Sequence, residues 1–241
     1  SKRIISFKIF IFTAKIDPSR HRGTPWIHEK MYNFCRWYFK SACYPEDQER
    51  GIIPFSVGCE NKYFETYDSF GSYEKQIDVF ISFGNMQTGS TGLRKEIVDL
   101  FQNGYKNTSC IITGGSGSGG LGYRKGDMKP NDYYKTILQS YIVPSSWGGM
   151  LWSMREWEVL ASGTLCFMQR PPILYATPKP KDGMHWVEYS DMNEFQEKLD
   201  YYISNKDLCV KIGNAGKEHA LKYHTSKAKT RYVLDIMKNS K

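Results

Sequence analysis

Residues 77–83 of the 241-residue chain read Ile-Asp-Val-Phe-Ile-Ser-Phe. A short run that is almost continuously apolar is typical of a strand buried on both faces, as in a parallel sheet. Further short apolar runs follow at residues 109–113, 141–144 and 164–168. Because parallel strands are joined by crossovers, usually helical, this alternation predicts an α/β fold whose site lies in loops at the carboxyl ends of the strands.

Helical spacing of apolar residues separates these runs. We expect helices at about 93–102, 131–140 and 155–162, and a helical tail after residue 190. Asp191 and Glu194 have the spacing of an N-terminal capping box, and Thr225 can cap the last helix.

The part before residue 75 shows a less regular alternation of predicted strands and helices. Residues 4–12 form a candidate strand, and apolar residues at spacings of three and four predict one helix over 26–41. Residues 52–57 are a second candidate strand, whereas 58–72 are expected to form an irregular connector.

Length and composition agree with a folded protein. The chain is 40% hydrophobic and 24% charged, which excludes a disordered or collagenous chain. The length allows one large domain or one complete and one reduced domain. We expect a reduced or truncated N-terminal α/β portion over residues 1–75 and a Rossmann-like parallel sheet with flanking helices over 76–241. The longest apolar run is far shorter than the roughly 20 residues of a membrane helix.

The formal net charge is +8, from 33 Lys plus Arg and 25 Asp plus Glu. A nucleic-acid-binding module is therefore one alternative, although the basic residues are scattered rather than gathered in one arm. They suit an enzyme that holds a diphosphate equally well.

The six cysteines include no CxxC pair and no histidine partner at zinc spacing. They predict mostly buried thiols, no metal site and a reducing, cytoplasmic compartment. The chain opens without a signal-peptide pattern, which leaves secretion open.

Residues 115–120 read Gly-Ser-Gly-Ser-Gly-Gly, which fits GxGxxG after a strand and raises a second alternative, an NAD-linked oxidoreductase. The third glycine should then open a helix, but Leu-Gly-Tyr-Arg-Lys-Gly-Asp follows. A mobile loop is the better interpretation, from which Arg124 and Lys129 could close over a phosphate.

The most informative stretch is Arg155-Glu-Trp-Glu158-Val-Leu-Ala-Ser-Gly163. Arg155 and Glu158 are three residues apart and share a helix face. The helix begins after a strand-ending loop and stops at a glycine, so its first turn is expected at the ligand crevice. There a carboxylate can accept the hydroxyls of a ribose and a guanidinium can hold a diphosphate. An exposed ion pair is the competing structural interpretation.

From Asp78 to Arg231 the chain resembles the nucleotide-sugar-binding, C-terminal half of GT-B glycosyltransferases, in particular the CgeB-like and exostosin-like group. The resemblance covers about 150 residues and is carried by landmarks in order: Phe83-Gly84, Arg94, Tyr134, Leu138, Ser140, Pro144, Arg155, Glu158, Ala161, Gly163, Asp191, Ala215-Gly216 and His224-Thr225.

This resemblance implies a transferase that moves a hexose or pentose from a nucleotide sugar, best matched by a UDP-sugar, to a glycan acceptor, with no other cofactor. Glu158 would bind the donor's ribose and Arg155 its diphosphate. The remaining donor-side candidates are Gly84, Arg94, Arg124, Lys129, Ser145 and His185.

The resemblance also bears on mechanism. Many retaining enzymes carry a second glutamate where this chain has Met150, so an inverting, metal-independent reaction is favoured. The base that deprotonates the acceptor is then expected in the N-terminal portion, where Asp17, His21 and His28 are candidates. No nucleic-acid partner and no membrane segment are expected.

Overall fold

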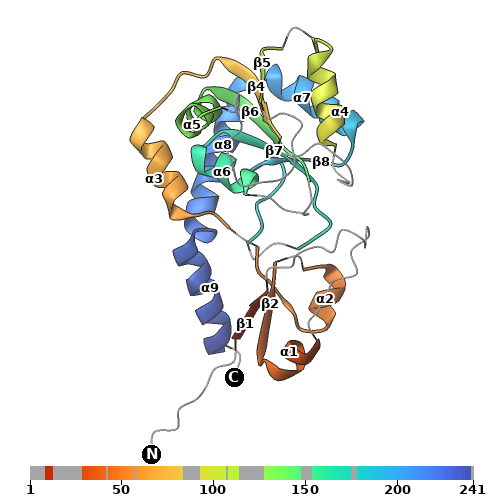
Figure 1. The fold of residues 1–241 in the computed structure, drawn as a ribbon, viewed down its shortest axis with the longest axis vertical. Helices are drawn as coiled ribbons and strands as arrows, with labels where there is room; N and C mark the ends of the chain where they lie inside the picture. Colours follow the sequence, from red (N-terminus) through yellow and green to blue (C-terminus); the bar gives the residue numbers. More distant parts are fainter. Residues whose placement is uncertain are drawn as a thin grey trace, which may run out of the picture. The chain divides into compact units, whose positions relative to one another are not determined.

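The computed structural model describes most of the chain (Figure 1). The described residues are 9–12, 29–41, 43–56, 58–83, 93–106, 108–113, 128–147, 154–174 and 178–239. The chain divides into two compact units. Unit 1 contains residues 1–57, 172–179 and 231–241, and unit 2 contains residues 58–171 and 180–230. The boundary expected between residues 75 and 76 falls inside unit 2.

Unit 2 is built on a five-stranded parallel sheet in the order β5-β4-β6-β7-β8. Its strands are β4 (Ile77–Ser82), β5 (Cys110–Thr113), β6 (Ser140–Ser145), β7 (Leu165–Gln169) and β8 (Val187–Tyr189). The α/β class expected from the apolar runs is confirmed, and β8 is a strand that the sequence did not indicate.

Helices cover both faces of this sheet. Val79, Ile81 and Phe167 pack with residues of α4 and α7 in one core cluster. The alternate residue Phe80 faces the opposite side, where its ring contacts Tyr133 of α5. Figure 1 shows the same separation of α4 and α7 from α5. The helices of unit 2 are α3 (Asn61–Phe70), α4 (Arg94–Gln102), α5 (Pro130–Leu138), α6 (Arg155–Ser162), α7 (Met192–Ile203), α8 (Lys206–Tyr223) and the start of α9 (Ser226–Asn239).

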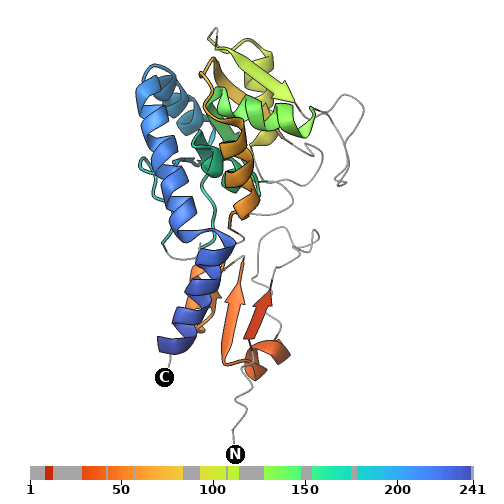
Figure 2. The same ribbon diagram turned by 90° about the vertical axis from the view of Figure 1, so that its left-hand side faces the viewer.

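Unit 1 holds a three-stranded parallel sheet in the order β1-β2-β3. Figure 2 shows β1 and β2 side by side. The elements are β1 (Ile9–Phe12), α1 (Glu29–Phe34), β2 (Trp37–Lys40), α2 (Pro45–Glu49) and β3 (Ile53–Pro54). Val233 in the last part of α9 packs with Trp37 and Phe39 of β2.

Two expectations for the N-terminal part are wrong. The single helix over 26–41 is replaced, within its described residues, by the short helix α1 and the strand β2, whose four residues are all buried. A helical pattern of apolar residues cannot be told from a strand when neighbouring positions are also apolar. The irregular connector over 58–72 contains α3, where Tyr63, Phe64 and Tyr67 form a buried face.

The cysteines are free thiols, and Cys43, Cys59, Cys166 and Cys209 are buried, which confirms the expectation of mostly buried thiols. Within the described ranges, no group of three or more His, Cys, Asp or Glu side chains could hold a metal ion. None of the helices described is long and apolar enough to span a membrane.

Helix α8 packs closely on the turn between α6 and β7 because it has no side chain at Gly213. A Cβ atom there would overlap the carbonyl oxygen of Gly163, which is backbone and cannot rotate away. Gly163 itself ends α6 in the left-handed region, at φ 80°. Gly163 therefore ends α6, and Gly213 allows α8 to pack against the turn that follows α6.

We predict that Gly213→Ala destabilises unit 2. Alanine favours a helix, but the overlap with backbone forces α8 away from the turn, for which a net loss of about 1–3 kcal/mol is expected. Urea unfolding measures the change. Lys211→Ala, at an exposed position of the same helix, should change stability by less than about 0.5 kcal/mol. Equal stability of the two variants would contradict this account of the packing.

The start of α7 confirms the predicted cap. The side chain of Asp191 accepts a hydrogen bond from the backbone N–H of Glu194 (2.9 Å). The Glu194 carboxylate accepts one from the N–H of Ser190 (2.7 Å) and pairs with Lys198 (2.9 Å). Burial opposes ionisation of Glu194, but Lys198, the Ser190 N–H and Arg170 outweigh it and lower its pKa from 4.5 to about 2.

Stability should therefore depend on pH through Glu194. A carboxyl whose pKa is lower in the folded state stabilises the fold above the unfolded pKa and loses that effect as pH falls through the folded value. Glu194→Gln should be less stable than the parent protein by about 1 kcal/mol at pH 7, given partial exposure. The difference should shrink between about pH 4.5 and pH 2. Urea titrations across this range, with the exposed Glu197→Gln as control, test it, and a difference independent of pH would contradict it.

Candidate nucleotide-sugar site

The carboxyl ends of β6 and β7 and the start of α4 meet at one buried hydroxyl. Ser146 follows β6, and its hydroxyl donates to Oε1 of Gln169 at the end of β7 (2.6 Å) and accepts from the backbone N–H of Leu93 (3.0 Å). The same Gln169 oxygen accepts from the backbone N–H of Trp147 (3.2 Å). Gln169 is only 3% exposed. Its side chain therefore fixes three segments of the sheet's carboxyl edge relative to one another.

Arg94 is the first residue of α4, and it points back toward this edge. Its Nε and Nη2 donate to the carbonyl oxygen of Ser146 (3.0 and 2.9 Å), and its guanidinium lies over the Phe83 ring. Burial, followed by the positive charge of Arg155, lowers the pKa of Arg94 to about 10, while Tyr189 and Glu156 oppose the effect. The group remains a cation at neutral pH. The positive charge of Arg155, at the start of α6, therefore disfavours the charged form of Arg94, at the start of α4.

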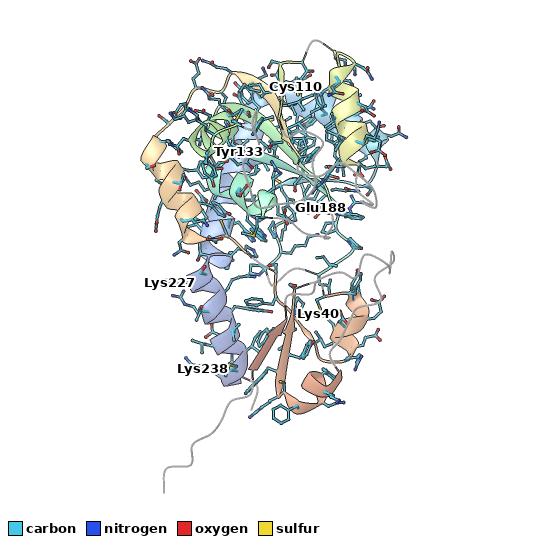
Figure 3. All side chains as sticks on the ribbon, in the orientation of Figure 1. Lys40, Cys110, Tyr133, Glu188, Lys227 and Lys238 are labelled. Atoms are coloured by element: carbon cyan, nitrogen blue, oxygen red, sulfur yellow. The ribbon has the colours of Figure 1, made fainter. Side chains whose placement is uncertain are left out.

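Arg155, Tyr133 and Glu158 form a hydrogen-bonded series, which we call the R-Y-E relay. Nη1 of Arg155 donates to the hydroxyl oxygen of Tyr133 (3.1 Å), and that hydroxyl donates to Oε2 of Glu158 (2.9 Å). Tyr133 comes from α5, and the other two come from the first two turns of α6. Tyr133 is labelled in Figure 3. The predicted pair thus shares one phenol, which sequence reasoning passed over in favour of its neighbour Tyr134.

Tyrosines of α3 also surround Glu158. The pKa of Tyr63 is raised first by burial and then by the negative charge of Glu158. The pKa of Tyr67 is raised by burial, and the nearby Tyr133 and Glu158 raise it further. These phenols stay neutral at ordinary pH, so they do not cancel the charge of the carboxylate.

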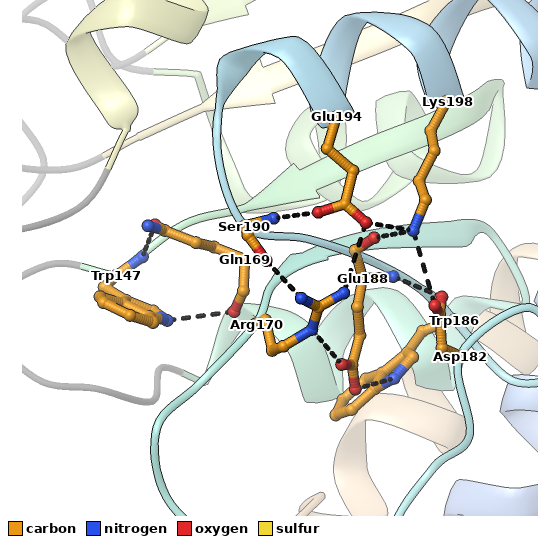
Figure 4. Close-up of polar contacts among 9 residues, drawn as sticks. All are labelled: Trp147, Gln169, Arg170, Asp182, Trp186, Glu188, Ser190, Glu194 and Lys198. Carbon is orange, nitrogen blue, oxygen red and sulfur yellow. Dashed lines mark hydrogen bonds and ion pairs between the residues drawn. The ribbon is translucent and has the colours of Figure 1, made fainter.

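A second polar group lies at the ends of β7 and β8 (Figure 4). Arg170 donates to the carboxylates of Glu188 (3.2 Å) and Glu194 (3.3 Å). Trp186 Nε1 donates to the other Glu188 oxygen (3.1 Å). Glu188 is 6% exposed. Because the protein's own donors satisfy these carboxylates, this group holds β7, β8 and α7 together.

The remaining predicted donor-side residues are spread out. Ser145 is buried, with its hydroxyl 3.4 Å from Oε2 of Glu156, a buried carboxylate that sequence reasoning also missed. Lys129 is exposed just before α5. His185 accepts a hydrogen bond at Nδ1 from the N–H of Lys181 (3.0 Å) and stacks on His219 at 4.1 Å. Burial, with the charges of His219 and Lys181, lowers the pKa of His185.

Five predicted residues lie outside the described part of the chain: Asp17, His21, His28, Gly84 and Arg124. Of the predicted donor-side set, the structure joins Arg155 and Glu158 through Tyr133, and Arg94 begins another helix at the same edge. The signal for Tyr133 was present as a tyrosine in the first turns of a helix that enters the same edge. For Gln169 there was none, because the end of a buried strand carries no periodic pattern that marks a polar residue.

Solved structures share this fold. TarM aligns with a TM-score of 0.55 at 13% identity, over 89% of this chain and 48% of that one, so the chain spans about half the length of TarM. Sucrose-phosphate synthase from Thermosynechococcus elongatus aligns with a TM-score of 0.52 at 9% identity (95% and 67%). A glycosyltransferase from Rickettsia africae ESF-5 aligns at 0.51 and 12% identity (95% and 68%). The fold is that of GT-B glycosyltransferases.

The sequence places the chain in a family. The model of the family described as "Glycosyl transferase-like" matches residues 95–235, more than half of the chain. The chain therefore belongs to the glycosyl transferase-like family. No curated protein matches it. The comparisons give no support to an NAD-linked oxidoreductase or to a nucleic-acid-binding module.

Proposed function

We propose that the chain transfers a hexose or pentose from a nucleotide sugar, a UDP-sugar, to a glycan acceptor, with inversion and without a required metal ion, in the manner of CgeB-like and exostosin-like enzymes. The family supports glycosyl transfer. The R-Y-E relay is the observation that carries the choice of donor class. It sets a carboxylate and a guanidinium apart at the carboxyl edge of the parallel sheet, where ligands of such folds bind.

The chemistry of the relay suits the two ends of a nucleoside diphosphate. Glu158 has acceptor capacity beyond the oxygen that Tyr133 occupies, because an ionised carboxylate accepts about four hydrogen bonds. It can therefore accept the two hydroxyls of a ribose. Arg155 presents a planar guanidinium fork, a geometry that suits contact with a diphosphate.

Leaving-group stabilisation would come from fixed positive charge. Arg94 and Arg155 each stand at the first position of a helix, where the partial positive charge of the helix terminus adds to theirs. Met150, at a position where many retaining enzymes have a glutamate, supports inversion. We retain Asp17, His21 and His28 as candidate bases for the acceptor hydroxyl, and Lys129, Arg124, Gly84, Ser145 and His185 as donor-side candidates.

The first prediction tests the ribose contact. Glu158→Gln keeps the shape and can still accept from Tyr133, but it removes the charge, so UDP affinity should fall by about 1.5–3 kcal/mol. Calorimetric titration with UDP, and with GDP and ADP in parallel, measures it. The exposed Glu60→Gln, a carboxylate next to α3, is the matched control and should bind like the parent. Unchanged affinity in folded Glu158→Gln would remove the ribose assignment.

The second prediction concerns the metal. If Arg94 and Arg155 supply the compensating charge, EDTA should leave the hydrolysis rate of a UDP-sugar within about twofold of the untreated rate, because the two guanidinium groups then stabilise the leaving diphosphate. The measurement uses a panel of UDP- and GDP-sugars with and without Mn²⁺. Loss of turnover in EDTA and recovery with Mn²⁺ would contradict the proposal, whereas Arg155→Met should lower turnover under both conditions.

A further inference from the structure

The Tyr133 hydroxyl has a defined direction in the relay. It carries one proton, which it gives to Glu158, and its oxygen accepts from Arg155. Burial raises the pKa of Tyr133, and the nearby Glu158 raises it while Arg155 lowers it. The phenol therefore remains protonated at neutral pH, and the hydrogen bonds cannot reverse.

The ring of Tyr133 is fixed by packing rather than by these hydrogen bonds. It contacts Phe80 of β4 edge-on at 5.7 Å and Tyr134 at 5.3 Å, and the Arg155 guanidinium lies 5.7 Å from its centre. Because β4 is an interior strand of the sheet, the ring packs against a rigid element. A flexible partner would have to be ordered at an entropic cost when ligand binds.

Without this hydroxyl, the side chains of Arg155 and Glu158 could form a direct ion pair. Arg155 and Glu158 are three apart on one helix, a spacing at which opposite charges pair directly. A direct pair would use the carboxylate and guanidinium groups that a ligand needs. With the phenol between them, each group makes a hydrogen bond to a neutral hydroxyl, and the Glu158 carboxylate keeps acceptor capacity for a ligand.

From this geometry we propose that Tyr133 is a positioning residue for nucleotide binding: it holds Glu158 and Arg155 apart and oriented, so that the ribose and diphosphate of one ligand are bound together. The inference rests on the proposed function, because it assigns those ligand groups to Glu158 and Arg155. It adds a residue of α5 that touches neither ligand group and acts through α6.

The test removes one oxygen atom. Tyr133→Phe should lower UDP affinity by about tenfold, the effect of losing a hydrogen bond to a charged group. In the Glu158→Gln background, the same change should lower it less than about twofold, because the partner through which Tyr133 acts has lost its charge. Tyr105→Phe, which removes a hydroxyl bound to Asp200, is the control and should leave UDP affinity unchanged. If GDP binds more tightly than UDP, GDP is the probe.

The outcomes separate the inference from the proposed function. Unchanged UDP affinity in Tyr133→Phe, with weakened binding in Glu158→Gln, overturns the inference alone. An equal loss in both backgrounds also overturns it, because a general loosening of the core would act in that way. Unchanged affinity in Glu158→Gln overturns the ribose assignment and the inference with it. If Tyr133→Phe does not fold, the double variant Arg155→Met/Glu158→Gln is compared with the two single variants, with Tyr133 intact in all three. Additive effects of the two substitutions on UDP affinity then overturn the inference.

Discussion

The strands of unit 2 are parallel, and the sheet is covered by helices on both faces. Parallel pairing places the carboxyl ends of β4, β6 and β7 at one edge, and each following helix starts from that edge. The first residues of α4 and α6, Arg94 and Arg155, therefore both lie at this edge. The close packing of α8 on the α6–β7 turn then fixes where α6 ends.

Charges at such an edge need partners, because a buried ion without hydrogen bonds costs several kcal/mol. The protein satisfies them in two different ways. At the ends of β7 and β8, Arg170 pairs with Glu188 and Glu194, and the group holds the structure together. In the R-Y-E relay a neutral phenol separates the opposite charges. The first arrangement uses its charges within the protein, and the second leaves the Glu158 carboxylate with acceptor capacity for a ligand.

The sequence predicted most of unit 2 because its signals there are local. The runs around β4, β5, β6 and β7 are short and apolar, and α6 was predicted over the residues that it occupies, since Gly163 marks its end. In unit 1 the prediction was poorer. β2 was read as the end of a helix because its residues are buried throughout, so no alternation marks a strand. The helix α3 was missed because its apolar face consists largely of tyrosines, which also occur in loops.

At the site, the chemistry of Arg155 and Glu158 could be predicted, but not their partner. Residues on one helix have a known spacing, whereas the contact of α5 with α6 depends on how two helices pack on β4 and β6. Tyr133 and Glu158 are 25 positions apart, so no local pattern relates them.

Under the proposed function, the neutral phenol of Tyr133 also helps to orient the ligand. A lysine in place of Tyr133 would pair with Glu158 and weaken its attraction for hydroxyl donors. The negative charge of Glu158 repels phosphate and attracts hydroxyls, while Arg155 and Arg94 attract phosphate. A ligand with a diol at one end and a diphosphate at the other then fits in one direction only. The reacting end of a nucleotide sugar, beyond its diphosphate, would in consequence always lie on the arginine side of the relay.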